Sequence, residues 1–317
     1  MSTGNFSEEF FEHFLAKVSE RFSAASNELT NVRCFSQSTL KRELIAIRDE
    51  LSFKGHKNVP AKTLISHLVH SGLLQRVPID KEQARNPVDV YTIGFGTTST
   101  LTPIELLTAI EPDGVVCFFT ALQIYDLTTQ LPSHHNVAKL TKPKAAAVVR
   151  NREERPPSAS SSKKRDRTSV GTLVFSFNAV SYYRNRRNKL LVPGVKTRYL
   201  GSKTIYRLTT LEQTLLDTLQ YPVHCGGPPI VFEAWENALG KIDEERLLEH
   251  LSSIGSDVVS RRTATMFVLL GHETGNELSG FFDEVKDRID GNTSHIPLLS
   301  GMDYHELDKN WLTRTPQ

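Results

Sequence analysis

The stretch "YRLTTLEQTLLDTLQ", residues 206–220, changes from a strand-like to a helix-like pattern at its paired threonines. Thr209 is a typical N-cap, and Glu212 can return a hydrogen bond to its backbone N–H, as in a capping box. Four leucines then recur at helical spacing and predict a buried face: Leu211, Leu215, Leu216 and Leu219. Upstream, "VKTRYLGSKTIYRL" has two strand-like halves around Gly201-Ser202, which suits a type II′ hairpin. A helix that follows a hairpin so closely indicates an α+β domain.

A second informative stretch is "VPAKTLISHLVHSGLL", residues 59–74. Pro60 suits a first helical turn and Gly72 suits a helix end. The apolar residues form one predicted stripe: Ala61, Leu64, Ile65, Leu68 and Val69. The opposite face holds residues that can hydrogen-bond to phosphates or base edges, none of them acidic: Lys62, Thr63, Ser66, His67 and His70.

The surrounding segments complete a recognisable order of elements. "FSEEFFEHFLAKVSERF" and "SQSTLKRELIAIRDELSFKG" are amphipathic and predict two earlier helices. After residue 72, "LLQRVPIDKEQARNPVDVYTIG" has two β-prone runs around a polar loop, which predicts a hairpin wing carrying Arg76, Lys81 and Arg85. This outline is typical of a winged helix-turn-helix.

We therefore predict a winged-helix DNA-binding domain over residues 1–96 and a second α+β domain over residues 97–317. In a winged helix the second helix of the motif enters the major groove and the wing contacts the backbone or minor groove. The predicted DNA-binding residues are Lys62, Thr63, Ser66, His67, His70, Arg76, Lys81 and Arg85. The alternative is a helical dimerisation domain with a polar solvent face, because the turn "SFKGHKN" is longer than usual.

Composition excludes several protein classes. The chain has 317 residues, 38% of them hydrophobic and 23% charged, which is typical of a globular protein. No apolar run reaches the roughly 18 residues of a membrane span, and the N-terminus lacks the pattern of a signal peptide, so we expect a cytoplasmic protein without a membrane partner. Cys34, Cys117 and Cys225 are widely spaced, which indicates buried small hydrophobes rather than disulfides or a zinc site.

Charge is distributed unevenly along the chain. Residues 97–210 carry 18 Lys or Arg and seven Asp or Glu, whereas residues 211–317 carry eight and 18. The basic middle can attract a polyanion, although it can equally neutralise the acidic end. Around residues 142–168, Pro, Ser and charges predict a flexible insertion. The cluster at Arg184, Arg186, Arg187 and Lys189, beside paired tyrosines, predicts a secondary polyanion patch.

Two motif-bearing segments and the C-terminal tail resemble the AbiEi family of abortive-infection antitoxins. "TPIELLTAIEPDGVVCFFTALQIYDLTTQLP" is similar to a family helix with a Thr/Ser-Ala-Leu step, followed by Tyr125-Asp126 where the family usually has His-Gly. "YRLTTLEQTLLDTLQYPVHCGG" is similar to its sheet-to-helix junction, which matches at Thr210, Glu212, Leu215, Leu216 and Asp217. The tail "HIPLLSGMDYHELDKNWL" is similar to its closing segment.

The resemblance implies an antitoxin of a bacterial toxin-antitoxin or phage-defence system. It implies that the protein counters a cognate nucleotidyltransferase-type toxin and represses its own promoter by binding double-stranded DNA. An alternative is a transcriptional regulator whose C-terminal domain senses a ligand or partner, with no toxin. A third hypothesis is a magnesium-dependent nuclease subunit of a defence system.

Sequence evidence for catalysis is weak, so we predict no enzyme, cofactor or metal. Asp217 and Gln213 lie one helical turn apart, which suits a surface pair better than a catalytic carboxylate. The carboxylates in "FEAWENALGKIDEER" follow helical spacing and suit a solvated face better than a magnesium site. His134-His135, expected on a loop, lacks a third ligand, and phosphate-loop, nucleophile-elbow and dinucleotide motifs are absent.

Overall fold

A computed structural model describes residues 8–22, 34–53, 56–93, 98–142, 170–200, 204–290 and 292–316. The chain is a mixed α+β protein that forms two compact units. Unit one contains residues 1–114, 173–182 and 197–206, and unit two contains residues 115–172, 183–196 and 207–317. Among the helices of the described ranges, none has both the length and the apolar character that crossing a bilayer requires.

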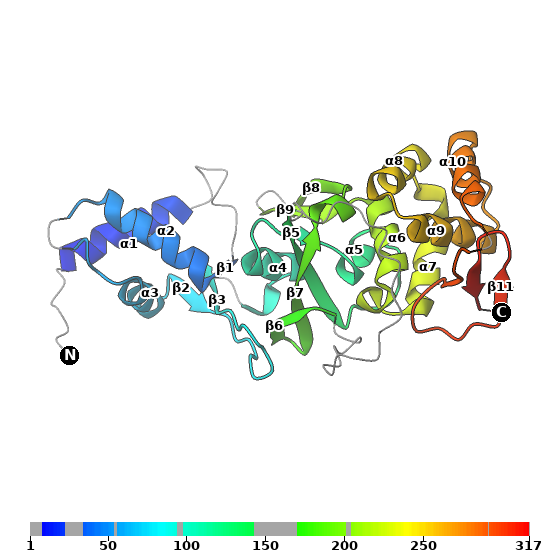
Figure 1. The fold of residues 1–317 in the computed structure, drawn as a ribbon. Coiled ribbons are helices and arrows are strands. Elements are labelled where there is room, and N and C mark those ends of the chain that lie inside the picture. Colours follow the sequence, from blue (N-terminus) through cyan, green and yellow to red (C-terminus); the bar gives the residue numbers. More distant parts are fainter. Residues whose placement is uncertain are drawn as a thin grey trace. The chain divides into compact units, whose positions relative to one another are not determined.

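The N-terminal part of unit one alternates helices with a small sheet (Figure 1). Its elements are α1 (Glu8–Phe22), β1 (Cys34–Ser36), α2 (Gln37–Glu50), α3 (Ala61–His70), β2 (Leu74–Arg76) and β3 (Val90–Ile93). β3 is the central strand and pairs antiparallel with both β1 and β2. The helices and sheet share one apolar core, to which α1 contributes Phe10 and Phe14, α2 contributes Leu44, and α3 contributes Leu64 and Leu68.

Unit one continues beyond the boundary expected at residue 96. After the 3₁₀ helix η1 (Thr98–Thr100), α4 (Pro103–Ile110) packs against β1. The "TPIELL" segment has the spacing of a capping box at α4, and both of its bonds are present: Thr102 Oγ1 accepts from the Glu105 N–H, and a Glu105 carboxylate oxygen accepts from the Thr102 N–H. Because α4 packs on β1, residues 98–114 belong to the first unit rather than the second, where the sequence analysis had assigned them.

A six-stranded sheet, whose residues are divided between the units, has the order β6-β7-β5-β4-β9-β8. Its strands are β4 (Val115–Val116), β5 (His134–Thr141), β6 (Thr172–Phe177), β7 (Val180–Asn188), β8 (Val195–Leu200) and β9 (Thr204–Thr209). β4 pairs antiparallel with β5 and parallel with β9. The expected pairing of β8 with β9 is confirmed. The turn between these strands, at residues 201–203, lies outside the described residues, and so does the insertion predicted around residues 142–168, apart from residue 142.

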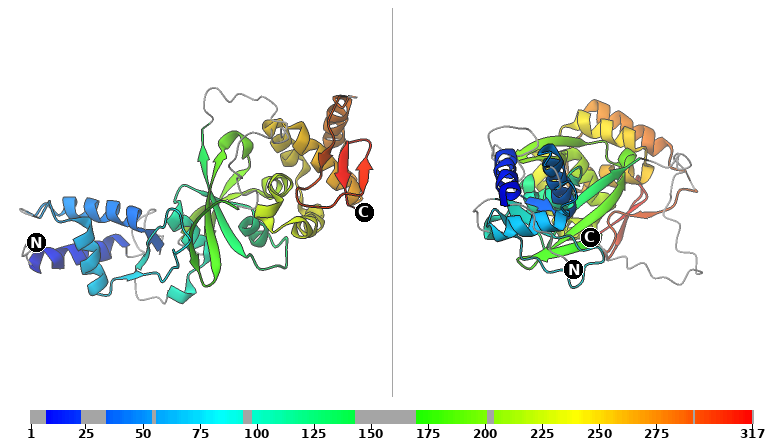
Figure 2. Two further views of the ribbon diagram at one scale, coloured as in Figure 1. Left: turned by 60° about the horizontal axis from the view of Figure 1, so that its bottom comes forward. Right: turned by 90° about the vertical axis from the view of Figure 1, so that its left-hand side faces the viewer.

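Helices make up most of the rest of unit two, and Figure 2 shows α6 to α9 gathered on one side of β5. The helices are α5 (Phe119–Ile124), α6 (Leu211–Gln220), α7 (Pro228–Ala238), α8 (Glu244–Ile254), α9 (Asp257–Leu269) and α10 (Asn276–Asp287), with 3₁₀ helices η2 (Lys189–Leu191), η3 (Pro222–Cys225) and η4 (Leu239–Lys241). The C-terminal strands β10 (Ile296–Pro297), β11 (Glu306–Asp308) and β12 (Thr313–Thr315) form a separate sheet with β12 in the centre.

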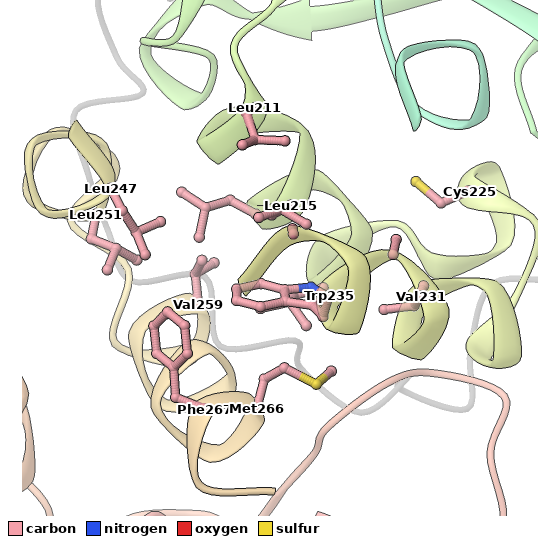
Figure 3. Packing of buried hydrophobic residues seen from close by; sticks show 14 of the residues in the cluster. Leu211, Leu215, Cys225, Val231, Trp235, Leu247, Leu251, Val259, Met266 and Phe267 are labelled. Atoms are coloured by element: carbon pink, nitrogen blue, oxygen red, sulfur yellow. The ribbon is translucent and has the colours of Figure 1, made fainter. Parts of the chain in front are cut away.

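The core of unit two is built around Trp235 of α7 (Figure 3). Its indole N–H donates to Thr218 Oγ1 over 3.0 Å, and its ring packs edge-on against Phe267 of α9. The four leucines predicted to form the buried face of α6 are all buried, which confirms the helical spacing. The N-cap, however, is Thr210 rather than Thr209, and its hydroxyl accepts from the Gln213 N–H. Cys34, Cys117 and Cys225 are buried, as predicted.

Candidate nucleic-acid interface

The chain around α3 is free of acidic side chains over a long stretch. Residues 51–79 contain four Lys or Arg and no Asp or Glu. Of these cations, Lys57 precedes α3 and Lys62 lies in its first turn, and both are exposed. The α3 N-terminus has no side-chain cap, so its first N–H groups add a partial positive charge at the same end. This end of α3 can therefore bind an anion such as a DNA phosphate.

The exposed face of α3 differs from the predicted one at its centre. Leu64, Ile65 and Leu68 are buried as expected, but Val69 is 42% exposed, so its assignment to the buried stripe is wrong. At roughly 100° per residue, Val69 lies about 20° around the helix from Lys62 and about 40° from the buried Ile65, so it lies at the border of the buried stripe. The exposed face consists of Lys62, Ser66, Val69 and His70.

His67 does not belong fully to that face. Its imidazole stacks on Phe11 of α1, with ring centroids 3.9 Å apart and planes 25° apart. Burial lowers the pKa of His67, and the neighbouring His70 lowers it further. The prediction that His67 reads DNA is therefore corrected, because its ring fastens α1 to α3. Thr63 is half-buried, whereas Lys62, Ser66 and His70 are exposed and remain predicted contact residues.

The predicted wing is an antiparallel hairpin whose cations share one carboxylate. Asp89 forms an ion pair with Arg76 over 2.7 Å and another with Lys81. Although burial opposes ionisation of Asp89, hydrogen bonds from Lys81 and Arg76 lower its pKa below the ordinary value. The sequence analysis missed this role of Asp89, which reduces the charge that the wing base presents. Arg85 is exposed between β2 and β3.

Backbone hydrogen bonds fix the start of the wing loop to β6, within unit one. The Asp80 N–H donates to the Ser176 carbonyl over 2.9 Å, and the Ser176 N–H donates to the Asp80 carbonyl over 2.8 Å. The loop thus leaves β2 from an anchored position rather than from a free hairpin end. No side-chain pattern encodes this bridge, so it could not be predicted from the sequence.

Tyr125 connects two parts of unit two that lie far apart in the sequence. The hydroxyl of Tyr125, at the end of α5, donates to the Thr209 carbonyl over 2.6 Å. The Lys196 ammonium lies 4.8 Å from the centre of the Tyr125 ring, a cation–π geometry. Tyr125 therefore joins α5 to the strand-to-helix junction before α6.

One residue of the predicted polyanion patch, Arg187 of β7, is buried and does not lie at the surface. Arg187 is buried and donates from both Nη atoms to the two carboxylate oxygens of Asp217, over 2.5 and 2.6 Å. Side chains alternate across a strand, so Arg186 lies on the other face and is exposed, while Arg184 is half-buried. Lys189 is exposed in η2. Arg187 is therefore a structural residue and is not available to a ligand.

Asp217 is fully buried, so the predicted surface pair with Gln213 is wrong. Gln213 is buried as well, and its amide donates to Asp217 Oδ1 over 2.8 Å. Both carboxylate oxygens already accept hydrogen bonds, which leaves Asp217 poorly placed to act as a base. Burial raises the pKa values of the nearby Cys117 and Cys225 thiols well above the ordinary value, so both are protonated. The cluster has the character of a polar core.

His134 and His135 lie on β5 and are buried, so the expectation of a loop was wrong. His134 Nε2 lies 3.0 Å from the His224 carbonyl, and His135 Nδ1 lies 3.3 Å from Thr120 Oγ1. Burial lowers the pKa of His135 to about 4 and that of His224 to about 4. Within the described ranges, no group of three or more His, Cys, Asp or Glu side chains is arranged to hold a metal ion.

Neither a model of a known protein family nor a curated protein sequence matches the chain. Among solved structures, it is similar to the crystal structure of the RV2827C protein from Mycobacterium tuberculosis, with 11% sequence identity and a TM-score of 0.47. That similarity covers 95% of this chain and 91% of the other.

Proposed function

We propose that the N-terminal part of unit one is a winged helix that binds double-stranded DNA. The observation that carries the proposal is the element order α1-β1-α2-α3-β2-β3 with β3 central in the small sheet. This is the order that a winged helix requires, with α3 as the helix that enters the major groove. The competing reading of a dimerisation domain accounts less well for a wing that joins β2 to β3.

Charge on the same elements supports this proposal. Lys62 and His70 lie on the exposed face of α3, and the acid-free stretch of residues 51–79 leaves no carboxylate there to repel phosphates. Phosphate contacts supply most of the affinity and set the register, whereas base-edge contacts supply specificity. We assign Lys62 and Arg85 to phosphates, and Ser66 and His70 to base edges.

We further propose that the chain is an antitoxin that represses its own promoter in the cytoplasm and counters a nucleotidyltransferase-type toxin. This rests on the AbiEi resemblance, and the contact between Tyr125 and Thr209 supports it by joining two of the matching segments. Unit two would act against the toxin, either by opposing its effect or by presenting the acidic surface of residues 211–317. No enzymatic activity, cofactor or membrane partner forms part of the proposal.

The second candidate is a transcriptional regulator without a toxin, favoured if unit two serves only to sense a partner. The adjacent reading frame separates the two, because a nucleotidyltransferase gene there supports the antitoxin and a metabolic gene supports the regulator. Co-expression then tests the antitoxin directly. Growth rescue of cells that express the neighbouring toxin would support it, whereas unchanged growth arrest would contradict it.

DNA binding is tested by fluorescence anisotropy with the full chain, its own upstream DNA and a scrambled duplex, at several salt concentrations. We expect tighter binding to the upstream DNA. Lys62→Ala should weaken binding to both duplexes and lower the slope of log K against log salt by about one unit. Equal affinity of the unaltered chain for the two duplexes would contradict promoter recognition, and an unchanged slope for Lys62→Ala would remove α3 from the DNA contact.

A further inference from the structure

The exposed face of α3 contains one apolar side chain among polar ones. Val69 is 42% exposed, whereas its neighbours on the face are Lys62, Ser66 and His70. Val69 lies at one edge of this face, about 20° around the helix from Lys62 and about 60° from Ser66, on the helix that the proposed function places in the major groove. On most protein surfaces an isolated exposed valine needs no explanation. On α3, however, the proposed function brings this valine close to the bases of the major groove.

The chemistry of this face fits the floor of the major groove. Of the groups that base pairs present there, only the 5-methyl group of thymine is apolar. A valine in a helix is held largely in one side-chain rotamer, so its two methyl groups are fixed in direction. Lys62 and the uncapped helix end draw the phosphate backbone towards the same face.

We infer that Val69 is a specificity-determining residue that contacts the 5-methyl group of thymine in the bound DNA. The inference rests on the proposed function and adds one base preference to it. Burial of about one methyl or methylene group against Val69 corresponds to roughly a fourfold change in affinity. Val69 thereby discriminates against cytosine, which lacks this methyl group.

The test uses the full chain and a duplex that the chain itself selects from a random-sequence pool. Thymines in the selected site are replaced by deoxyuridine one position at a time, which removes the methyl group and keeps the base pairing. We expect at least one replacement to weaken binding of the unaltered chain about fourfold. Val69→Ala should bind the thymine duplex about fourfold more weakly and should not respond to that replacement.

Ile45→Ala is the matched control, because Ile45 is an exposed apolar residue on α2 of the same unit. This variant should keep the full response to deoxyuridine. If the unaltered chain selects a sequence but binds every deoxyuridine duplex as tightly as the thymine duplex, the inference is overturned and DNA binding stands. If Val69→Ala responds to deoxyuridine as the unaltered chain does, Val69 is not the contact. If no sequence is selected, sequence-specific DNA binding and the inference fail together.

Discussion

Arg187 and Asp217 form a buried bidentate ion pair that ties β7 to α6, although 30 residues separate them. The Arg187 guanidinium also lies 5.0 Å from the centre of the Phe118 ring and 5.4 Å from that of Tyr221. Aromatic rings and the carboxylate thus enclose the charge on several sides. A buried charge that loses its partner is costly, because water cannot replace the lost interaction.

Asp217→Asn should therefore lower the free energy of unfolding by about 3–5 kcal/mol, since it leaves Arg187 charged and unpaired in the core. Urea denaturation followed by circular dichroism measures the change. The matched control is Asp257→Asn, because Asp257 pairs with Arg288 at the surface, where both side chains are about half exposed. That variant should cost less than about 1 kcal/mol. Equal losses in the two variants would contradict the assigned role of Asp217.

Asp89 restrains two of the predicted DNA-binding cations, so its removal should strengthen DNA binding. In Asp89→Asn, Arg76 and Lys81 lose their shared carboxylate and become available to phosphates. We expect tighter binding to specific and scrambled duplexes alike and a salt slope steeper by about one unit. Anisotropy titrations at several salt concentrations measure both quantities.

Glu82→Gln provides the control for Asp89→Asn, since Glu82 is exposed on the same loop and the charge change is identical. If release of Arg76 and Lys81 is the cause, Glu82→Gln should change the slope less than Asp89→Asn does. Equal effects would show that net charge alone, rather than the ion pairs, determines binding.

Substitution of the two histidines of α3 should change DNA affinity to different extents. His67→Phe keeps a ring stacked on Phe11, so we expect DNA affinity to change little. His70→Phe removes a hydrogen-bonding group from the exposed face, and we expect roughly three- to tenfold weaker binding to the specific duplex. Titrating both variants against that duplex tests the assignment. A larger loss in His67→Phe than in His70→Phe would reverse the roles given to these residues.

Local patterns in the sequence predicted local structure well. Thr102 and Glu105 have the spacing of a capping box, which marks the start of α4, and the leucine spacing of α6 identified its buried face. These predictions succeed because a cap and a helical stripe depend on residues within one or two turns. The hairpin at β2 and β3 was predictable for the same reason.

Pairings across the fold could not be predicted in this way. In the sequence, Arg187 belongs to a run of basic residues. Only the structure shows that Asp217 of α6 neutralises its charge. Val69 was placed in the apolar stripe by its chemical type, although its angular position lies next to Lys62. The stacking of His67 on Phe11 could be predicted only with knowledge of where α1 packs. For Arg187 and His67 the deciding neighbour lies on another element, beyond the reach of a periodic pattern, whereas the position of Val69 follows from helix geometry within α3.

Buried histidines in unit two should make the protein sensitive to mild acid. The pKa of His135 falls from about 6.5 in the unfolded chain to about 4 in the folded one, because burial disfavours the charged ring. The unfolded state then binds more protons between these values, so stability is fully present above about pH 6.5 and is lost as the pH falls towards 4. At about 1.4 kcal/mol per unit of pKa, protonation of His135 alone accounts for a loss on the order of 3 kcal/mol in the free energy of unfolding as the pH falls.

His135→Asn removes this titration and keeps a polar group near Thr120. We expect the drop in unfolding free energy between pH 7 and about pH 4.5 to be smaller by about 2–3 kcal/mol in this variant. Urea denaturation at both pH values gives the difference, so a uniform loss of stability caused by the substitution cancels. His295→Asn, which alters an exposed histidine, is the control variant in the same measurement. The same drop in His135→Asn and the unaltered chain would show that His135 does not stay neutral in the folded protein at pH 4.5.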